Sequence, residues 1–271
     1  MLFRSTVHPV TAPEIQNGSV LVIDGKIAEI GPRLASHQGA RIIDGRGLQL
    51  YPGMINAATN VGLAEIEALR DTVDLDEIGS FNPELRAEVA FNPSSQHVEV
   101  TRASGITSVI TLPGSGGRGG GRGDDGGLVI TGQGALMHLD GWTWDEMSLK
   151  RGAVMEMVFP QLQSSVPRQY AALMGATETS YQEREKQYKE RLERVSEFFE
   201  KARQYRQAKG AAPAEFRPDL RMEAMLPVID GKQPILVRAE RERMIKDAIA
   251  FGDKEKVKII IADPHELGRF G

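Results

Sequence analysis

The sequence predicts an α/β protein in which a small all-β unit precedes a series of βα units. Short apolar runs separated by Gly-containing turns fill the first 50 residues. After residue 50, longer segments of helical character separate five further apolar runs. Continuous apolar runs that alternate with helices are typical of buried parallel strands. We therefore expect the second part of the chain to form a partial barrel or an open sheet.

The all-β unit is expected over residues 1–50. Two apolar runs, Val20–Ile23 and Lys26–Gly31, flank Asp24-Gly25. This arrangement predicts a hairpin, because both central positions of a type I′ turn need positive φ. Two more short runs, at 40–44 and 48–51, complete the expected strands of this unit.

The second unit is expected over residues 51–271. Its predicted strands are Tyr51–Ala57, Ile106–Leu112, Ala153–Phe159, Ile235–Ala239 and Val257–Ala262. A loop is expected at 114–127, where nine of fourteen residues are glycine, because such a segment cannot offset its ordering entropy by burial.

A long inserted helix is expected at about 179–209, a segment rich in charge and free of Pro and Gly. Its apolar side chains follow the spacing of one helical stripe: Tyr188, Leu192, Val195, Phe199, Ala202 and Tyr205. This stripe predicts that the helix packs on the second unit, and a heptad-type contact with a partner is the alternative.

The composition of the chain limits which partners and which cellular locations are expected. A net charge of -4 supplies no basic field for nucleic acid or anionic lipid, so neither partner is expected. The chain has no cysteine, which excludes disulfides, thiolate catalysis and cysteine-ligated metals. Neither a signal peptide nor an apolar membrane span is evident, so a cytoplasmic protein is expected, or a periplasmic one if a leader is missing. The sequence is compatible with a homo-oligomer as well as with a monomer.

Three motifs, in order, resemble the N-terminal part of the amidohydrolase superfamily. Asn17–Gly31 resembles the family's first hairpin, Ile43–Gly47 resembles the step before its barrel, and Leu48–Leu63 resembles its first barrel strand. The resemblance implies a β-sandwich-like N-terminal domain, half of a composite sandwich, followed by a TIM-like (β/α) barrel. It also implies a hydrolase of carbon–nitrogen bonds other than peptide bonds, with a small-molecule substrate and a divalent metal such as zinc.

A further segment, Ile130–Met147, resembles an imidazolonepropionase-like branch of this superfamily. It contains Trp142 and Trp144, which we expect to anchor the loop to the barrel rim because indoles bury large areas. The alternative is that both tryptophans line a pocket.

The positions of the family's His-X-His metal pair hold Ala58 and Asn60, and the Asp that precedes the pair is Asn56. Alanine offers no ligand, and an amide oxygen is a poor substitute for imidazole. The remaining histidines form no His-X-His or His-X-X-X-His pair: His8, His37, His97, His138 and His265. The sequence therefore does not support the metal that the resemblance implies.

Candidate pocket residues follow from the rule that barrel active sites lie at the C-terminal ends of strands. These candidates are Asn60, Arg238, Glu240, Asp263 and His265. In the alternative interpretation, Arg238 and Glu240 belong to the cap and charged face of the following helix.

The chain is short for a complete barrel of this kind. A full barrel needs about 250 residues, and only about 220 follow the β unit, which favours a truncated chain or a fragment. Two functions remain open: a hydrolase, or a catalytically inactive homologue that keeps the scaffold for ligand binding or assembly.

Overall fold

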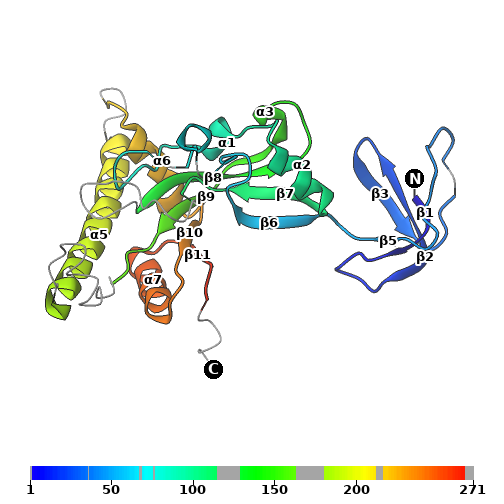
Figure 1. The fold of residues 1–271 in the computed structure, drawn as a ribbon. Coiled ribbons are helices and arrows are strands. Elements are labelled where there is room, and N and C mark those ends of the chain that lie inside the picture. Colours follow the sequence, from blue (N-terminus) through cyan, green and yellow to red (C-terminus); the bar gives the residue numbers. More distant parts are fainter. Residues whose placement is uncertain are drawn as a thin grey trace. The chain divides into compact units, whose positions relative to one another are not determined.

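The computed structural model describes residues 2–35, 37–66, 69–75, 77–114, 129–162, 180–211 and 216–265. The chain divides into two compact units, Met1–Met54 and Ile55–Gly271, which are described separately (Figure 1). Apart from Gly114, the predicted loop at 114–127 lies outside the described residues. Among the helices described, none is long and apolar enough to cross a membrane.

The first unit is a five-stranded sheet. Its strands are β1 (Leu2–Val7), β2 (Ile15–Ile23), β3 (Lys26–Gly31), β4 (Ile43–Asp44) and β5 (Gln49–Leu50). They lie in the order β3-β2-β1-β4, and β5 also pairs with β1. The expected hairpin is confirmed: Ile23 pairs with Lys26, and Asp24 and Gly25 have φ values of 51° and 73°.

The second unit is built on a curled six-stranded sheet in the order β11-β10-β9-β8-β7-β6. Its strands are β6 (Met54–Thr59), β7 (Ile106–Thr111), β8 (Ile130–His138), β9 (Ser148–Val158), β10 (Ile235–Arg238) and β11 (Ile259–Ala262). Strands β9, β10 and β11 are parallel. All five predicted strands are present, with ends shifted by a few residues, so the mixed α/β class is confirmed.

Strand β8 corrects the expectation of an all-parallel series, because it runs antiparallel to both β7 and β9. Its glycines interrupt the apolar pattern, so no strand was expected there. Neighbouring residues of the same chain leave no room for a side chain at these glycines. A Cβ at Gly134 would lie 2.5 Å from Leu112 Cδ2, and one at Gly132 would lie 2.9 Å from Leu85 Cβ. Close backbone approach thus took precedence over strand propensity.

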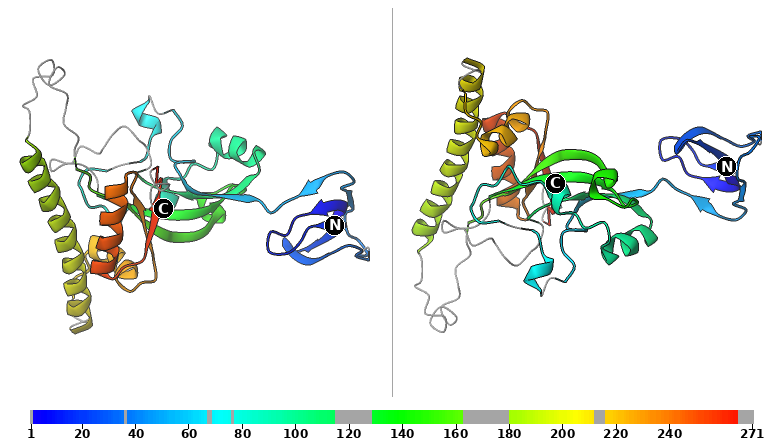
Figure 2. Two further views of the ribbon diagram at one scale, coloured as in Figure 1. Left: turned by 90° about the horizontal axis from the view of Figure 1, so that it is seen from below. Right: turned by 90° about the horizontal axis from the view of Figure 1, so that it is seen from above.

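The described helices are η1 (Arg70–Thr72), α1 (Ala87–Ala90), α2 (Gln96–Ala103), α3 (Trp144–Met147), α5 (Tyr181–Ala211), α6 (Leu220–Ile229) and α7 (Glu242–Glu255). They are short except for α5, α6 and α7, which pack on one face of the sheet. In both views of Figure 2, α7 (orange) lies beside α5 (yellow-green). Val195, Phe199 and Ala202 of α5 are fully buried in one core cluster with β9, β10, α6 and α7. The α5 stripe therefore packs within the chain and is not left for a heptad partner.

The sheet has two different faces, because side chains alternate along each strand. One face of β9 and β10 packs against the helices through Met155, Met157, Ile235 and Val237. The opposite face carries a small apolar cluster of Leu112, Val154, Leu236 and Ala262, against which Ala58 and Ile110 pack. By the same alternation, Glu156 and Arg238 belong to this second face.

The two tryptophans have different environments. Trp144 packs against the cluster formed by Phe91, Val98, Met137 and their neighbours, and the Arg151 guanidinium lies 5.1 Å from its ring centroid. Trp142 is 92% exposed. The expected anchoring role is therefore confirmed for Trp144 and wrong for Trp142.

Removing the Phe199 ring should strongly destabilise the second unit, because this fully buried ring stacks edge-on against Phe251 at 5.3 Å. We expect Phe199→Ala to lower the free energy of unfolding by about 3–5 kcal/mol in urea titrations. Leu220→Ala is the control, since Leu220 is 74% exposed, and it should change stability by less than about 0.5 kcal/mol. Similar losses in both variants would contradict the core assignment.

Candidate functional site

The candidate site lies where the strands of the second unit end. The Leu112 amide donates to the Thr59 carbonyl at 2.9 Å, so the C-terminal ends of β6 and β7 meet. Parallel pairing brings Val158, Arg238 and Ala262 side by side at the ends of β9, β10 and β11. Strand β8 begins at this same edge, where Ile130 lies opposite Met157.

Four polar side chains form one network at this edge: three come from the successive strands β8, β9 and β10, and the fourth follows β11. Thr131 Oγ1 donates to Glu156 Oε2 at 2.7 Å, and Arg238 Nε donates to Glu156 Oε1 at 2.6 Å. Arg238 Nη1 donates to Asp263 Oδ2 at 2.5 Å. We call Thr131, Glu156, Arg238 and Asp263 the edge network.

Exposure increases along the edge network. The Glu156 side chain is 0% exposed, that of Arg238 is 21% exposed and that of Asp263 is 45% exposed. Burial raises the pKa of Glu156, whereas the charge and hydrogen bond of Arg238 act in the opposite direction. The network thus runs from a buried carboxylate to one that solvent or a ligand can reach.

Backbone features fit closely around this network. A Cβ at Gly114 would lie 2.5 Å from Thr131 Cγ2 and 2.9 Å from Glu156 Oε2, so only glycine lets the chain after β7 pass here. Asp263 has a φ of 55°, in the left-handed region that Asp tolerates better than most residues. Its carboxylate reaches Arg238 from this position.

The structure brings together two of the five residues singled out in the sequence, Arg238 and Asp263. Arg238 lies in β10 and not in a helix cap, which corrects the alternative interpretation. Glu240 and His265 are exposed, and Asn60 is partly buried just after β6. None of the three hydrogen bonds that form the edge network involves these three residues.

Sequence reasoning missed Glu156 and Thr131. Glu156 carried a usable signal, because it stands alone in the apolar run Ala153–Phe159, and charged residues are almost never fully buried unless paired. Thr131 gave no sequence signal of a special role, since threonine is common in strands.

The residues at this edge do not fit the divalent metal that the family resemblance implies. The Ala58 methyl packs against the apolar cluster of the open face, and the Asn56 amide oxygen accepts from the Ala58 backbone N–H at 3.2 Å. Glu156 and Asp263 are already bound by Arg238. Within the described ranges, no three His, Asp or Glu side chains are grouped to hold a metal.

A small hollow lies beside Pro113. It measures about 110 Å³, and its lining residues are Asp74, Leu75, Glu77, Leu85, Arg86, Ala87, Ala90 and Pro113. Pro113 immediately precedes Gly114, whose position borders Glu156.

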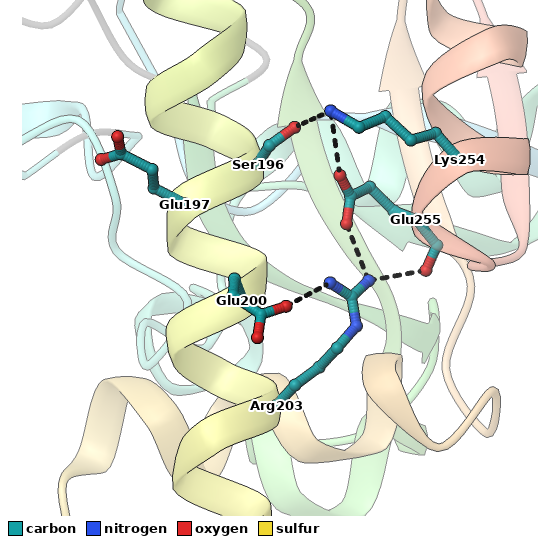
Figure 3. Close-up of a pocket in the computed structure, with 6 residues that line it drawn as sticks. All are labelled: Ser196, Glu197, Glu200, Arg203, Lys254 and Glu255. Carbon is teal, nitrogen blue, oxygen red and sulfur yellow. Dashed lines mark hydrogen bonds and ion pairs between the residues drawn. The ribbon is translucent and has the colours of Figure 1, made fainter.

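A larger hollow between α5 and α7 has a structural explanation (Figure 3). Arg203 points between Glu200 and Glu255 and donates to both, and Lys254 donates to Ser196 at 3.0 Å. Glu255 is 4% exposed, so Arg203 neutralises a nearly buried carboxylate. These pairs join the two helices.

The chain resembles known hydrolases, although no family model matches it. Its structure is similar to that of an amidohydrolase from Thermotoga maritima, with a TM-score of 0.76 and 25% sequence identity. That match covers 96% of this chain and 63% of the other protein. The expected similarity to amidohydrolases is therefore confirmed at the level of the fold.

Two sequence relatives are 5'-deoxyadenosine deaminases from Methanothermobacter thermautotrophicus and Methanobrevibacter smithii. They are 33% identical over 73 residues and 34% identical over 70 residues. These matches span 25% and 26% of this chain, and 17% and 16% of the relatives.

The pH dependence of stability should reveal the buried Glu156. Its pKa is raised in the folded chain, so its favourable contribution is complete below about pH 4.3, the unfolded value, and is lost as pH rises through the folded pKa. We expect the wild type to lose stability relative to Glu156→Gln as pH increases across this window, measured by urea titration at several pH values.

The exposed Glu197→Gln variant on α5 is the control for this experiment, and its stability should follow that of the wild type at each pH. A constant difference between wild type and Glu156→Gln from pH 4 to 8 would contradict a raised pKa of Glu156 in the folded chain.

Proposed function

We propose that this chain belongs to a hydrolase that acts on carbon–nitrogen bonds other than peptide bonds, with its substrate bound at the strand edge that carries Arg238 and Asp263. The observation that carries the proposal is the structural match to an amidohydrolase over 96% of the chain. The deaminase relatives add support, because deamination of a ring carbon is itself hydrolysis of a carbon–nitrogen bond.

The finer assignments are part of the same proposal. The six-stranded sheet is a segment of a TIM-like barrel, and the β unit before it is half of a composite sandwich. The substrate is a small molecule. The motif at Ile130–Met147 favours the imidazolonepropionase-like branch. The chain spans 63% of its structural neighbour, and its matches span under a fifth of its sequence relatives, so the activity of the whole protein is part of this proposal.

Arg238 and Asp263 are the groups of this chain that can meet a substrate. Guanidinium N–H groups that are not bound to the carboxylates can donate to a carbonyl oxygen or a ring nitrogen. The half-exposed carboxylate of Asp263 can accept from a substrate N–H or from the attacking water. Glu156 and Thr131 position Arg238 and do not reach the substrate themselves.

A second candidate is a catalytically inactive homologue that binds a ligand on the same scaffold. Ala58 favours it, because this side chain extends an apolar cluster at a position where the family resemblance implies a metal ligand. In this candidate the edge network stabilises the sheet, and ligand recognition occurs without turnover.

Turnover by purified protein tests both candidates. We would follow hydrolysis of amides, lactams and 5'-deoxyadenosine by mass spectrometry, and compare the wild type with Asp263→Asn. Losing a charged hydrogen-bond partner costs about 1.5–3 kcal/mol, so kcat/KM should fall roughly 10- to 100-fold.

Asp253→Asn is the matched control, since Asp253 is an exposed acid on α7, and kcat/KM should stay within about twofold of wild type. Equal activity in Asp263→Asn and wild type would remove Asp263 from the site. A folded wild type that hydrolyses no compound in the panel would favour the inactive homologue.

A further inference from the structure

We infer that the guanidinium of Arg238 is the resident cation of the edge network and takes the place of a divalent metal ion between Glu156 and Asp263. The inference concerns what holds the site together. It does not depend on the chain having hydrolase activity, because its tests measure metal content and thermal stability.

The first argument is that three of the four carboxylate oxygens already have hydrogen-bond partners. Both oxygens of Glu156 already accept hydrogen bonds, one from Thr131 and one from Arg238. Asp263 uses one oxygen for Arg238. A structural zinc site needs about four ligands, whereas this pair could offer a metal the second oxygen of Asp263 without breaking an existing contact.

The second argument is charge. Arg238 carries a permanent positive charge, because guanidinium does not deprotonate in proteins. It comes from β10, between the strand that carries Glu156 and the strand that precedes Asp263. A divalent cation placed between the same two carboxylates would be repelled by this charge. Arg238 therefore supplies the neutralisation and competes directly with a metal.

The third argument is the apolar neighbourhood. Ala58, Val154, Leu236 and Ala262 pack together on the same face of the sheet. An apolar cluster supplies no ligands and raises the cost of an incompletely coordinated ion. Arginine suits such a position better, because its planar fork binds two carboxylates and is weakly hydrated.

Metal binding by the wild type is the first test. We would incubate the protein separately with Zn²⁺ and Mn²⁺, remove unbound ions and measure the metal content by mass spectrometry. We expect well below one equivalent of either ion. One bound equivalent that is lost in Glu156→Gln or Asp263→Asn would overturn the inference.

Removing the cation is the second test. Arg238→Ala leaves two carboxylates without their partner, and Mn²⁺, which favours oxygen ligands, should bind between them. Added Mn²⁺ should then raise the Tm of this variant by a few degrees, since about 1 kcal/mol of binding energy corresponds to roughly 2–4 °C in a unit of this size. The wild type and Arg238→Ala/Asp263→Asn should show no such shift.

Arg206→Ala is the matched control, because Arg206 pairs with a single carboxylate, Asp230, on the helical side. An Mn²⁺ shift in Arg206→Ala as large as that in Arg238→Ala, or no shift in Arg238→Ala, would overturn the inference. If Arg238→Ala does not fold, Arg238→Lys keeps the charge and should also bind no Zn²⁺ or Mn²⁺. One equivalent bound by Arg238→Lys would contradict the charge argument and overturn the inference.

Discussion

The buried carboxylate of Glu156 is the constraint on which the edge of the sheet depends. An ionised carboxylate without partners in an apolar interior costs several kcal/mol, so its two oxygens need donors from neighbouring strands. Thr131 on β8 and Arg238 on β10 supply them. These contacts link three adjacent strands, and Arg238 extends the link to Asp263 after β11.

The edge network lies on the face of the sheet that α5, α6 and α7 do not cover. Helices α5, α6 and α7 cover the opposite face, where Phe199, Met225 and Phe251 pack against β9 and β10. Because side chains alternate along a strand, the same packing that buries Met155 and Met157 turns Glu156 to the other face. Core packing on one side therefore fixes the position of the charged groups on the other.

The fold resembles that of an amidohydrolase, but the side chains at the strand ends differ from the metal-binding pattern that the family resemblance implies. A TM-score of 0.76 to an amidohydrolase shows that the backbone arrangement is shared. The side chains at the strand ends depart from the metal-binding pattern, since Ala58 joins an apolar cluster and Arg238 lies between two carboxylates. A fold can keep its strand geometry while the residues at its functional edge change, because burial of the core does not depend on them.

The sequence by itself determined the mixed α/β class, the Asp24-Gly25 hairpin, five of the six strands in the sheet of the second unit, and the buried stripe of α5. Turn chemistry and hydrophobic periodicity are local signals, so they can be read from the sequence. Only the tertiary structure decided that β8 enters the sheet antiparallel and that Glu156 and Thr131 join Arg238 and Asp263. Gly132 and Gly134 let β8 pass close to Leu85 and Leu112, and the edge network depends on strand register. Both are contacts between residues far apart in the chain, which no local pattern encodes.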